Sequence, residues 1–220
     1  MPSINLLPDN TRVDVGTIYG IGRNYVRHIE ELNNEMPDEP VLFLKPAASL
    51  ITQTRQIELP AFSTDIHHEV EVVLLVGREG RNISKEDALR HVTGVGVGLD
   101  LTARDTQSTL REKGLPWTTS KGFETAACVS DFLPIQRFRD LGKLHFRLRV
   151  NGELRQEGDS SLMIFPVPAI IAHISSIITL QPGDLIFTGT PHGVARITPG
   201  DQLDLSLEDI LRARFTVAGS

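Results

Sequence analysis

The stretch from His67 to Val76 constrains the fold most, because it joins a run of β-branched and aliphatic residues to two carboxylates at one end. Successive side chains of a strand point to opposite faces, so Glu69 and Glu71 share a face, which continues along the strand with Val73. Two carboxylates this close repel each other unless a positive group lies between them, and a divalent cation is the simplest such group. The alternative is a half-exposed strand end whose glutamates face water or pair with Arg or Lys.

A second predicted strand, from Val92 to Asp100, supplies a third carboxylate. Its apolar residues alternate with three glycines, which leaves one face of the strand without side chains. A bare strand face lets a backbone or a ligand approach closely, and Asp100 projects from that face at the end of the strand. We therefore interpret Asp100 as the third ligand of a metal site. The alternative is that Asp100 caps a helix in the segment that begins at Leu101.

Three carboxylates without a cysteine form a hard-oxygen site, which suits Mg²⁺, Mn²⁺ or Ca²⁺ better than zinc. His67 and His68 adjoin the glutamate pair but lack the spacing of a helical zinc motif. A histidine at this place can hold a carboxylate or a water without binding the ion itself. An octahedral ion with three protein ligands keeps three positions for water and a bidentate substrate.

Composition narrows the class of protein. The 220 residues carry a net charge of −6 and no cluster of Lys and Arg, which argues against nucleic acid and for a small-molecule substrate. Cys128 is the single cysteine, so no internal disulfide can form, in keeping with a reducing compartment. The N-terminal residues lack the apolar core of a signal peptide, and no run approaches membrane-spanning length. We expect a cytoplasmic protein with one domain over 1–220 and a short, irregular N-terminal arm over about 1–14.

A predicted helix over about 25–34 carries a candidate acid–base pair. His28 and Glu31 lie three residues apart and therefore share a face of this helix. A carboxylate that contacts a histidine orients the ring and makes it more basic, as a general base that activates water requires. The alternative is an incidental His–Glu pair on a surface helix. The preceding Gly20-Ile21-Gly22 lacks the third glycine of a dinucleotide fingerprint, so it predicts a tight turn instead.

The other segments predict more sheet than helix. Residues 41–45 form a short strand with Lys45 at an exposed end, and 84–91 predicts a helix that begins with a capping box. The Asn-Gly pair within 147–156 predicts a hairpin with a type I′ turn, and the isoleucines of 166–178 predict a helix that faces the core. These elements predict an α+β chain dominated by mixed sheet.

Seven motifs, in order along nearly the whole chain, resemble the fumarylacetoacetate hydrolase (FAH) family, in particular its short single-domain branch of acylpyruvate hydrolases and oxaloacetate decarboxylases. They are Gly20–Tyr25, Pro40–Pro46, His67–Glu71, Leu99–Gln107, Gly114–Trp117, Val150–Glu153 and Thr188–Pro191. Several independent motifs that coincide are more specific than any one of them. The resemblance implies a mixed β-sandwich roll with few helices, which usually forms a homodimer.

The resemblance also implies roles for individual residues. The metal ligands are Glu69, Glu71 and Asp100, and the ion is Mg²⁺, with Mn²⁺ as a substitute and Ca²⁺ able to occupy the site in crystals. The catalytic residues are His28, Glu31 and Lys121, and the substrate-binding residues are Arg23, Gln107 and Thr190.

The implied chemistry is cleavage of a C–C bond in a 2-oxo acid. In acylpyruvate hydrolysis the His28–Glu31 pair activates water against the distal carbonyl, while Lys121 helps to hold the developing charge. Loss of CO₂ from oxaloacetate leads to the same pyruvate enolate without a hydrolytic water. Two alternatives remain open: an isomerase or tautomerase of unsaturated 2-oxo diacids such as 2-hydroxyhepta-2,4-diene-1,7-dioate, and a non-catalytic, metal-dependent protein that binds oxo acids.

Two departures from the family pattern bear on the size and specificity of the pocket. Ala195-Arg196 follows Gly193-Val194 where a glycine is common, and Ala127-Cys128 stands where the branch usually has Cys-Pro. Neither departure involves a predicted metal ligand.

Overall fold

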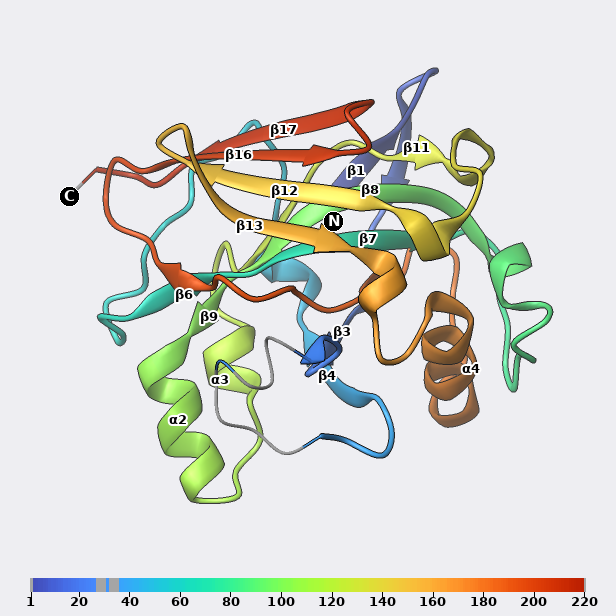
Figure 1. The fold of residues 1–220 in the computed structure, drawn as a ribbon, viewed down its shortest axis with the longest axis horizontal. Coiled ribbons are helices and arrows are strands. Elements are labelled where there is room, and N and C mark those ends of the chain that lie inside the picture. Colours follow the sequence, from blue (N-terminus) through green and yellow to red (C-terminus); the bar gives the residue numbers. More distant parts are fainter. Residues whose placement is uncertain (1, 27–30, 32–35, 220) are drawn as a thin grey trace.

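The computed structural model describes residues 2–26, 31 and 36–219, and its largest element is an eight-stranded mixed sheet (Figure 1). Seven strands follow the order β4-β3-β14-β7-β8-β10-β5, and β11 pairs with β8. β14 is parallel to β3 and β10 is parallel to β5, whereas β7 and β8 are antiparallel. The bounds are β3 (Ile18–Gly22), β4 (Val41–Lys45), β5 (Leu50–Ile51), β7 (Val70–Val76), β8 (Val92–Asp100), β10 (Ala127–Val129), β11 (Leu133–Pro134) and β14 (Leu185–Phe187).

Three smaller sheets and a few helices complete the described part of the chain. The four-stranded antiparallel sheet contains β13 (Glu153–Asp159), β12 (His145–Val150), β16 (Gln202–Leu207) and β17 (Leu211–Thr216). The three-stranded sheet contains β15 (Ala195–Arg196), β6 (Ile66–His68) and β9 (Thr102–Ala103), and β1 (Ser3–Leu6) pairs with β2 (Thr11–Asp14). The helices are α2 (Arg104–Glu112), α3 (Thr118–Lys121) and α4 (Val167–Ile177), with 3₁₀ turns at Ala47–Ser49, Ala88–His91, Ile135–Arg137, Leu141–Lys143 and Ser160–Leu162.

The four-stranded sheet packs on one face of the large sheet, so β7 is buried on both sides. Val72 and Leu74 share one core cluster with Phe146 of β12, whereas Val73 lies with Phe187 in a second cluster on the opposite face. Full burial of each such side chain contributes about 1.5–3 kcal/mol. Figure 1 shows the two layers, with α2 and α3 on the side of the large sheet away from β16 and β17. This arrangement confirms the predicted α+β sandwich of mixed sheet.

Two local predictions are confirmed. Asn151 and Gly152 join β12 to β13 with φ values of 52° and 84°, as a type I′ turn requires. The predicted core helix is α4, which agrees with the expected bounds to within a residue at each end. Among the described residues, no helix is both long enough and apolar enough to cross a membrane.

Three other local predictions are wrong. Lys45 is 1% exposed rather than at an open strand end, because its ammonium group turns inward toward Asp100. The 84–91 segment contains only a 3₁₀ turn at 88–91, since its residues provide too short an apolar stripe to hold a full helix. The N-terminal arm is a β-hairpin, β1–β2, anchored by the buried Ile4.

The glycine-bare face of β8 admits the close approach of a backbone that was expected, together with core side chains. A Cβ on Gly98 would lie 2.6 Å from the carbonyl oxygen of Cys128 and 3.0 Å from the Phe187 ring. The face is therefore filled by core packing along most of its length. Only its last residue, Asp100, reaches the group of carboxylates described below.

Candidate active site

Three carboxylates meet where β7 begins and β8 ends. Glu71 lies opposite Gly98 in the antiparallel register, and the Asp100 amide donates a 2.9 Å hydrogen bond to the Glu69 carbonyl just before β7. One oxygen from each carboxylate of Glu69, Glu71 and Asp100 lies within 4.8 Å of the other two. All three side chains are buried. The structure thus brings together the three residues predicted as metal ligands, and Asp100 ends a strand rather than capping a helix.

Three cationic side chains surround this carboxylate cluster, defined as Glu69, Glu71 and Asp100. Lys121, at the end of α3, donates to Glu69 at 2.8 Å and to Asp100 at 2.5 Å. Lys45 lies 2.6 Å from the other Asp100 oxygen.

The third cation, Arg104, is the first residue of α2, and its guanidinium group binds Glu69 and the side-chain oxygen of Gln107. Lysine and arginine therefore neutralise Glu69 and Asp100 directly.

Glu71 is the carboxylate with the least compensation. Burial raises its pKa well above the usual value, and the negative charges of Asp100 and Glu69 raise it further. The amide of Gly189 donates to Glu71 at 2.6 Å and acts in the opposite direction. For Lys121, burial alone lowers the pKa, but Asp100 and Glu69 outweigh burial, so the pKa is raised.

A hard divalent cation fits this donor set. Mg²⁺ and Mn²⁺ prefer carboxylate oxygens, and three such oxygens converge in a buried site whose Glu71 charge is otherwise unfavourable. In the described residues, no cysteine takes part in the cluster. Glu69, Glu71 and Asp100 are the residues that would hold the ion.

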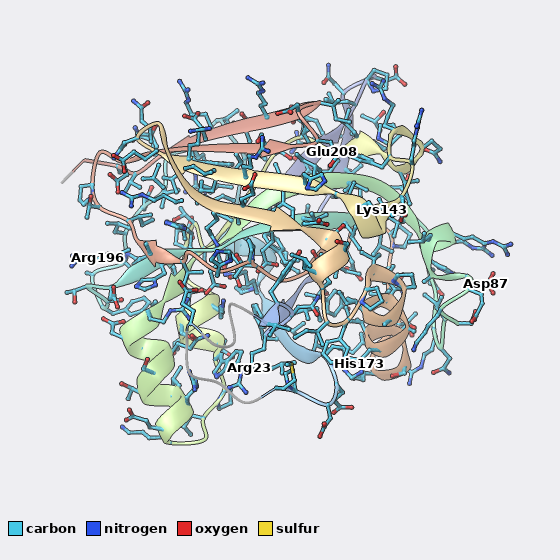
Figure 2. All side chains as sticks on the ribbon, in the orientation of Figure 1. Arg23, Asp87, Lys143, His173, Arg196 and Glu208 are labelled. Atoms are coloured by element: carbon cyan, nitrogen blue, oxygen red, sulfur yellow. The ribbon has the colours of Figure 1, made fainter. Side chains whose placement is uncertain are left out.

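The predicted substrate-binding residues line one pocket with the two glutamates. Arg23, Gln107, Thr190 and Lys121 all contribute to its wall. Figure 2 labels Arg23, which follows β3 on the same side of the molecule as α2 and α3. Lys121 therefore lies between the pocket and Asp100, with which it forms an ion pair.

Thr190 is held from two directions. Its hydroxyl donates to the Val70 carbonyl at 2.9 Å and accepts from the Gln156 amide at 3.0 Å. The preceding Gly189 has φ of 105°, and a Cβ there would lie 2.6 Å from the Cβ of Asn24. Glycine is required at this position because a side chain would displace the amide that binds Glu71.

The His28–Glu31 pair is only partly described. His28 lies outside the described residues. Glu31 is exposed, and its carboxylate accepts hydrogen bonds from the Gly193 amide at 3.1 and 3.2 Å. Glu31 is thus connected to the 189–193 loop that carries Thr190, and its role with His28 stays a prediction.

His67 and His68 do not contact the carboxylate cluster through their hydrogen bonds. His67 pairs with Asp65 at 3.0 Å, and His68 lies 2.9 Å from the side-chain oxygen of Gln156. Burial is the main reason that the pKa of each imidazole is lowered. A role of these histidines as zinc ligands receives no support from this geometry.

Sequence reasoning missed Lys45, Arg104 and Gln156 as parts of the site. Arg104 precedes Gln107 by three residues, a helical spacing that signals a shared face. No local signal marks Lys45 or Gln156, because both reach the site through pairing between distant strands.

Comparisons with known proteins agree with this geometry. Residues 17–218 match the family model described as fumarylacetoacetate (FAA) hydrolase C-terminal. The chain is 44% identical over 207 residues to the mitochondrial oxaloacetate decarboxylase of Dictyostelium discoideum, covering 90% of this chain and 95% of that protein. It is 43% identical over 200 residues to the mitochondrial oxaloacetate tautomerase FAHD1 of Rattus norvegicus, covering 91% of this chain and 90% of that protein.

A solved structure extends the likeness to the fold. The crystal structure of fumarylpyruvate hydrolase from Pseudomonas aeruginosa, in complex with Mn²⁺ and pyruvate, matches with a TM-score of 0.95 and 31% identity. The match covers 100% of this chain and 96% of that one. The family model matches nearly the whole length of this chain. The chain therefore belongs to the fumarylacetoacetate hydrolase family and has the fold of that family's C-terminal domain.

Proposed function

We propose that the protein is a divalent-metal-dependent hydrolase that cleaves acylpyruvates to pyruvate and a carboxylic acid, and that also decarboxylates oxaloacetate. The observation that carries the proposal is the buried carboxylate cluster at the base of a pocket lined by Arg23, Gln107 and Thr190. The named activities of the three relatives, on oxaloacetate and on fumarylpyruvate, support the same class of 2-oxo acid. We propose Mg²⁺ as the ion, with Mn²⁺ as a substitute.

The ion, when bound, would polarise the 2-oxo group and stabilise negative charge as a bond to C3 breaks. The protein's own residues bind and orient the substrate. Thr190, with its hydroxyl fixed by Val70 and Gln156, offers a rigid contact for the substrate carboxylate. Arg23 and Gln107 line the same pocket and provide further donors for oxygen atoms.

The remaining steps involve proton transfer and charge. His28, supported by Glu31, takes a proton from water, whose oxygen attacks the distal carbonyl carbon. The C–C bond then breaks, its electron pair passes to C3, and a proton at C3 completes pyruvate. Lys121, within hydrogen-bonding distance of Glu69 and Asp100, keeps positive charge next to this reaction centre. For oxaloacetate, CO₂ leaves and no water is needed.

A tautomerase is the second candidate, because a relative of 43% identity bears that name. Proton removal from C3 and its return to oxygen would use the same pocket without cleavage.

A non-catalytic protein that binds oxo acids is the third candidate. We also propose a homodimer, with neither nucleic acid nor a membrane as a partner.

The test measures pyruvate release from acetylpyruvate and, separately, from oxaloacetate. Chelator-stripped protein is assayed with and without added Mg²⁺ or Mn²⁺, and metal-only blanks correct for spontaneous decay of both compounds. We expect metal-dependent release from acetylpyruvate that falls at least about a hundredfold in His28→Ala, since removal of a positioned acid–base group typically costs about 10²–10⁴-fold. Glu71→Gln, which removes a charged ligand of the proposed ion, should also remove most of the metal-dependent release. Glu153→Gln, at an exposed hairpin position, is the matched control.

Each other outcome selects an alternative. If the protein interconverts the enol and keto forms of oxaloacetate only when metal is added, and releases no pyruvate from acetylpyruvate, the protein is a tautomerase. Binding of pyruvate without any turnover would identify the non-catalytic protein.

A further inference from the structure

Two neighbouring pockets share part of their lining, and one of them reaches the carboxylate cluster. The inner pocket, which Glu69 and Glu71 line, is small, about 30 Å³. The outer pocket measures about 540 Å³. Arg23, Arg111 and Trp117 line both pockets and therefore lie at their junction. A substrate whose 2-oxo acid end reached the cluster would place its distal end beside these three residues.

The sequence of α2 explains why Arg111 lies at this junction. Arg104, Gln107 and Arg111 have the i, i+3, i+7 spacing of residues on one helical face. The first two are engaged close to the cluster, since Arg104 binds both Glu69 and Gln107. Arg111 lies a turn further along the same face. In the part of the chain that the structure describes, the ion pair that α2 forms with the cluster uses Arg104 and not Arg111.

The opposite wall of the junction has a fixed conformation. Arg23 has φ of 58°, in the left-handed region that costs a non-glycine residue roughly 1–2 kcal/mol. The Trp117 ring packs against Phe43 with centroids 6.1 Å apart, and a Cβ on Gly22 would lie 3.2 Å from it. A strained backbone next to a rigid aromatic wall is typical of a binding site.

The charges of the outer pocket favour an anion. Among the described residues that line it, Arg23 and Arg111 contribute two positive charges, and Glu112 contributes one negative charge. Leu115 and Trp117 provide apolar surface for a short carbon chain in the outer pocket. Guanidinium groups bind carboxylates through paired hydrogen bonds, which distinguishes a carboxylate from a methyl group at the same position.

We propose that Arg111, together with Arg23, forms a second anion subsite that makes the site selective for 2-oxo diacids over 2-oxo monoacids. This inference rests on the proposed function, because it places the 2-oxo acid end of the substrate at the carboxylate cluster. It adds a specificity-determining residue, Arg111, that the family resemblance did not supply. The preferred substrates then carry an anionic group at the end remote from the 2-oxo acid.

Binding of matched 2-oxo acids tests the subsite. The dissociation constants of 2-oxoglutarate and 2-oxovalerate, and of 2-oxoadipate and 2-oxohexanoate, are measured by titration calorimetry on Mn²⁺-loaded protein. Each pair has equal carbon number and differs in the distal carboxylate. We expect the wild type to prefer the diacid in at least one pair by about two- to fivefold, within the range for an exposed charge pair.

Variants of α2 test whether Arg111 causes the preference for diacids. Arg111→Gln should reduce the diacid-to-monoacid affinity ratio to near one, and Arg111→Lys should retain part of it. Lys113→Gln removes an exposed cation two residues away that does not line the outer pocket, and should keep the wild-type ratio. A wild type without a diacid preference in either pair, or an Arg111→Gln protein that keeps it, overturns the proposal.

Pyruvate release from acetylpyruvate, measured on the same preparations, separates the two claims. Acetylpyruvate has no second carboxylate, so its cleavage tests the proposed function without the subsite. If cleavage is intact but the affinity ratio does not depend on Arg111, the subsite alone is wrong. If cleavage is absent but the ratio falls only in Arg111→Gln, the proposed function is wrong and the subsite stands.

Discussion

The ammonium nitrogen of Lys45 lies 2.6 Å from the Oδ1 atom of Asp100, and each of the two side chains is about 1% exposed. Lys45 also donates to the carbonyl oxygens of Leu101 at 3.1 Å and Ala126 at 2.9 Å, and to that of Lys121. These bonds join the end of β8 to the segment that follows α3. The lysine therefore fixes Asp100 relative to Lys121.

Lys45→Met should lower the free energy of unfolding by about 3–5 kcal/mol, because it removes one of the two lysines that pair with the buried Asp100 carboxylate and a donor to three carbonyl groups. Urea unfolding followed by circular dichroism measures the change. Lys143→Met is the matched control: Lys143, labelled in Figure 2, is 78% exposed and lies 3.9 Å from Asp140. Its replacement should change the free energy by less than about 1 kcal/mol.

The double variant Lys45→Met/Asp100→Asn tests the reason for that loss. Removing the charge of Asp100 as well should recover part of the stability, since the buried carboxylate that has lost one of its two lysine partners is then neutral. A Lys45→Met protein as stable as the wild type would show that the ion pair contributes nothing to the fold.

The contribution of Asp201 to the free energy of unfolding of the protein depends on pH. Its carboxylate accepts hydrogen bonds from the Thr198 amide at 2.7 Å and from the Asn151 side chain at 2.8 Å. Burial by itself raises the pKa of Asp201, but these hydrogen bonds outweigh it and the pKa is lowered. A lowered carboxyl pKa contributes stability above the unfolded-state value of about 4, and this contribution is lost as pH falls through the folded-state pKa.

Asp201→Ala should therefore reduce the free energy of unfolding by about 1–2 kcal/mol at pH 7, with the difference from wild type shrinking below about pH 4. Urea titrations between pH 3 and pH 7 measure it. Glu86→Ala, at an exposed position, should show no such trend. A difference that is constant over this range would mean that the Asp201 hydrogen bonds do not depend on its charge.

Sequence periodicity predicted the parts of the site that lie on single strands. The alternation of β7 and β8 placed Glu69, Glu71 and Asp100 on one face, and the antiparallel register then brings them together. The type I′ turn at Asn151-Gly152 follows from local backbone preferences alone. These features depend on residues close in sequence, which is why they were predictable.

The positions of Lys45 and Gln156 depend on contacts between distant segments. Lys45 is 55 residues from Asp100, and Gln156 is 34 from Thr190. Strand propensity assigns both to strands but does not say which strands are neighbours, so Lys45 was predicted to be exposed. The cytoplasmic location expected from the sequence stays a prediction, and two of the three relatives, the decarboxylase and the tautomerase, are named as mitochondrial.

Mn²⁺ binding measured by electron paramagnetic resonance tests whether Glu69, Glu71 and Asp100 hold a divalent cation. Wild-type protein should bind one tight Mn²⁺ per chain, and added Mg²⁺ should displace it. Glu71→Gln should weaken binding at least tenfold, whereas Glu153→Gln should not change it. A wild-type protein without a tight site, or a Glu71→Gln protein that binds Mn²⁺ as strongly as wild type, would contradict the account.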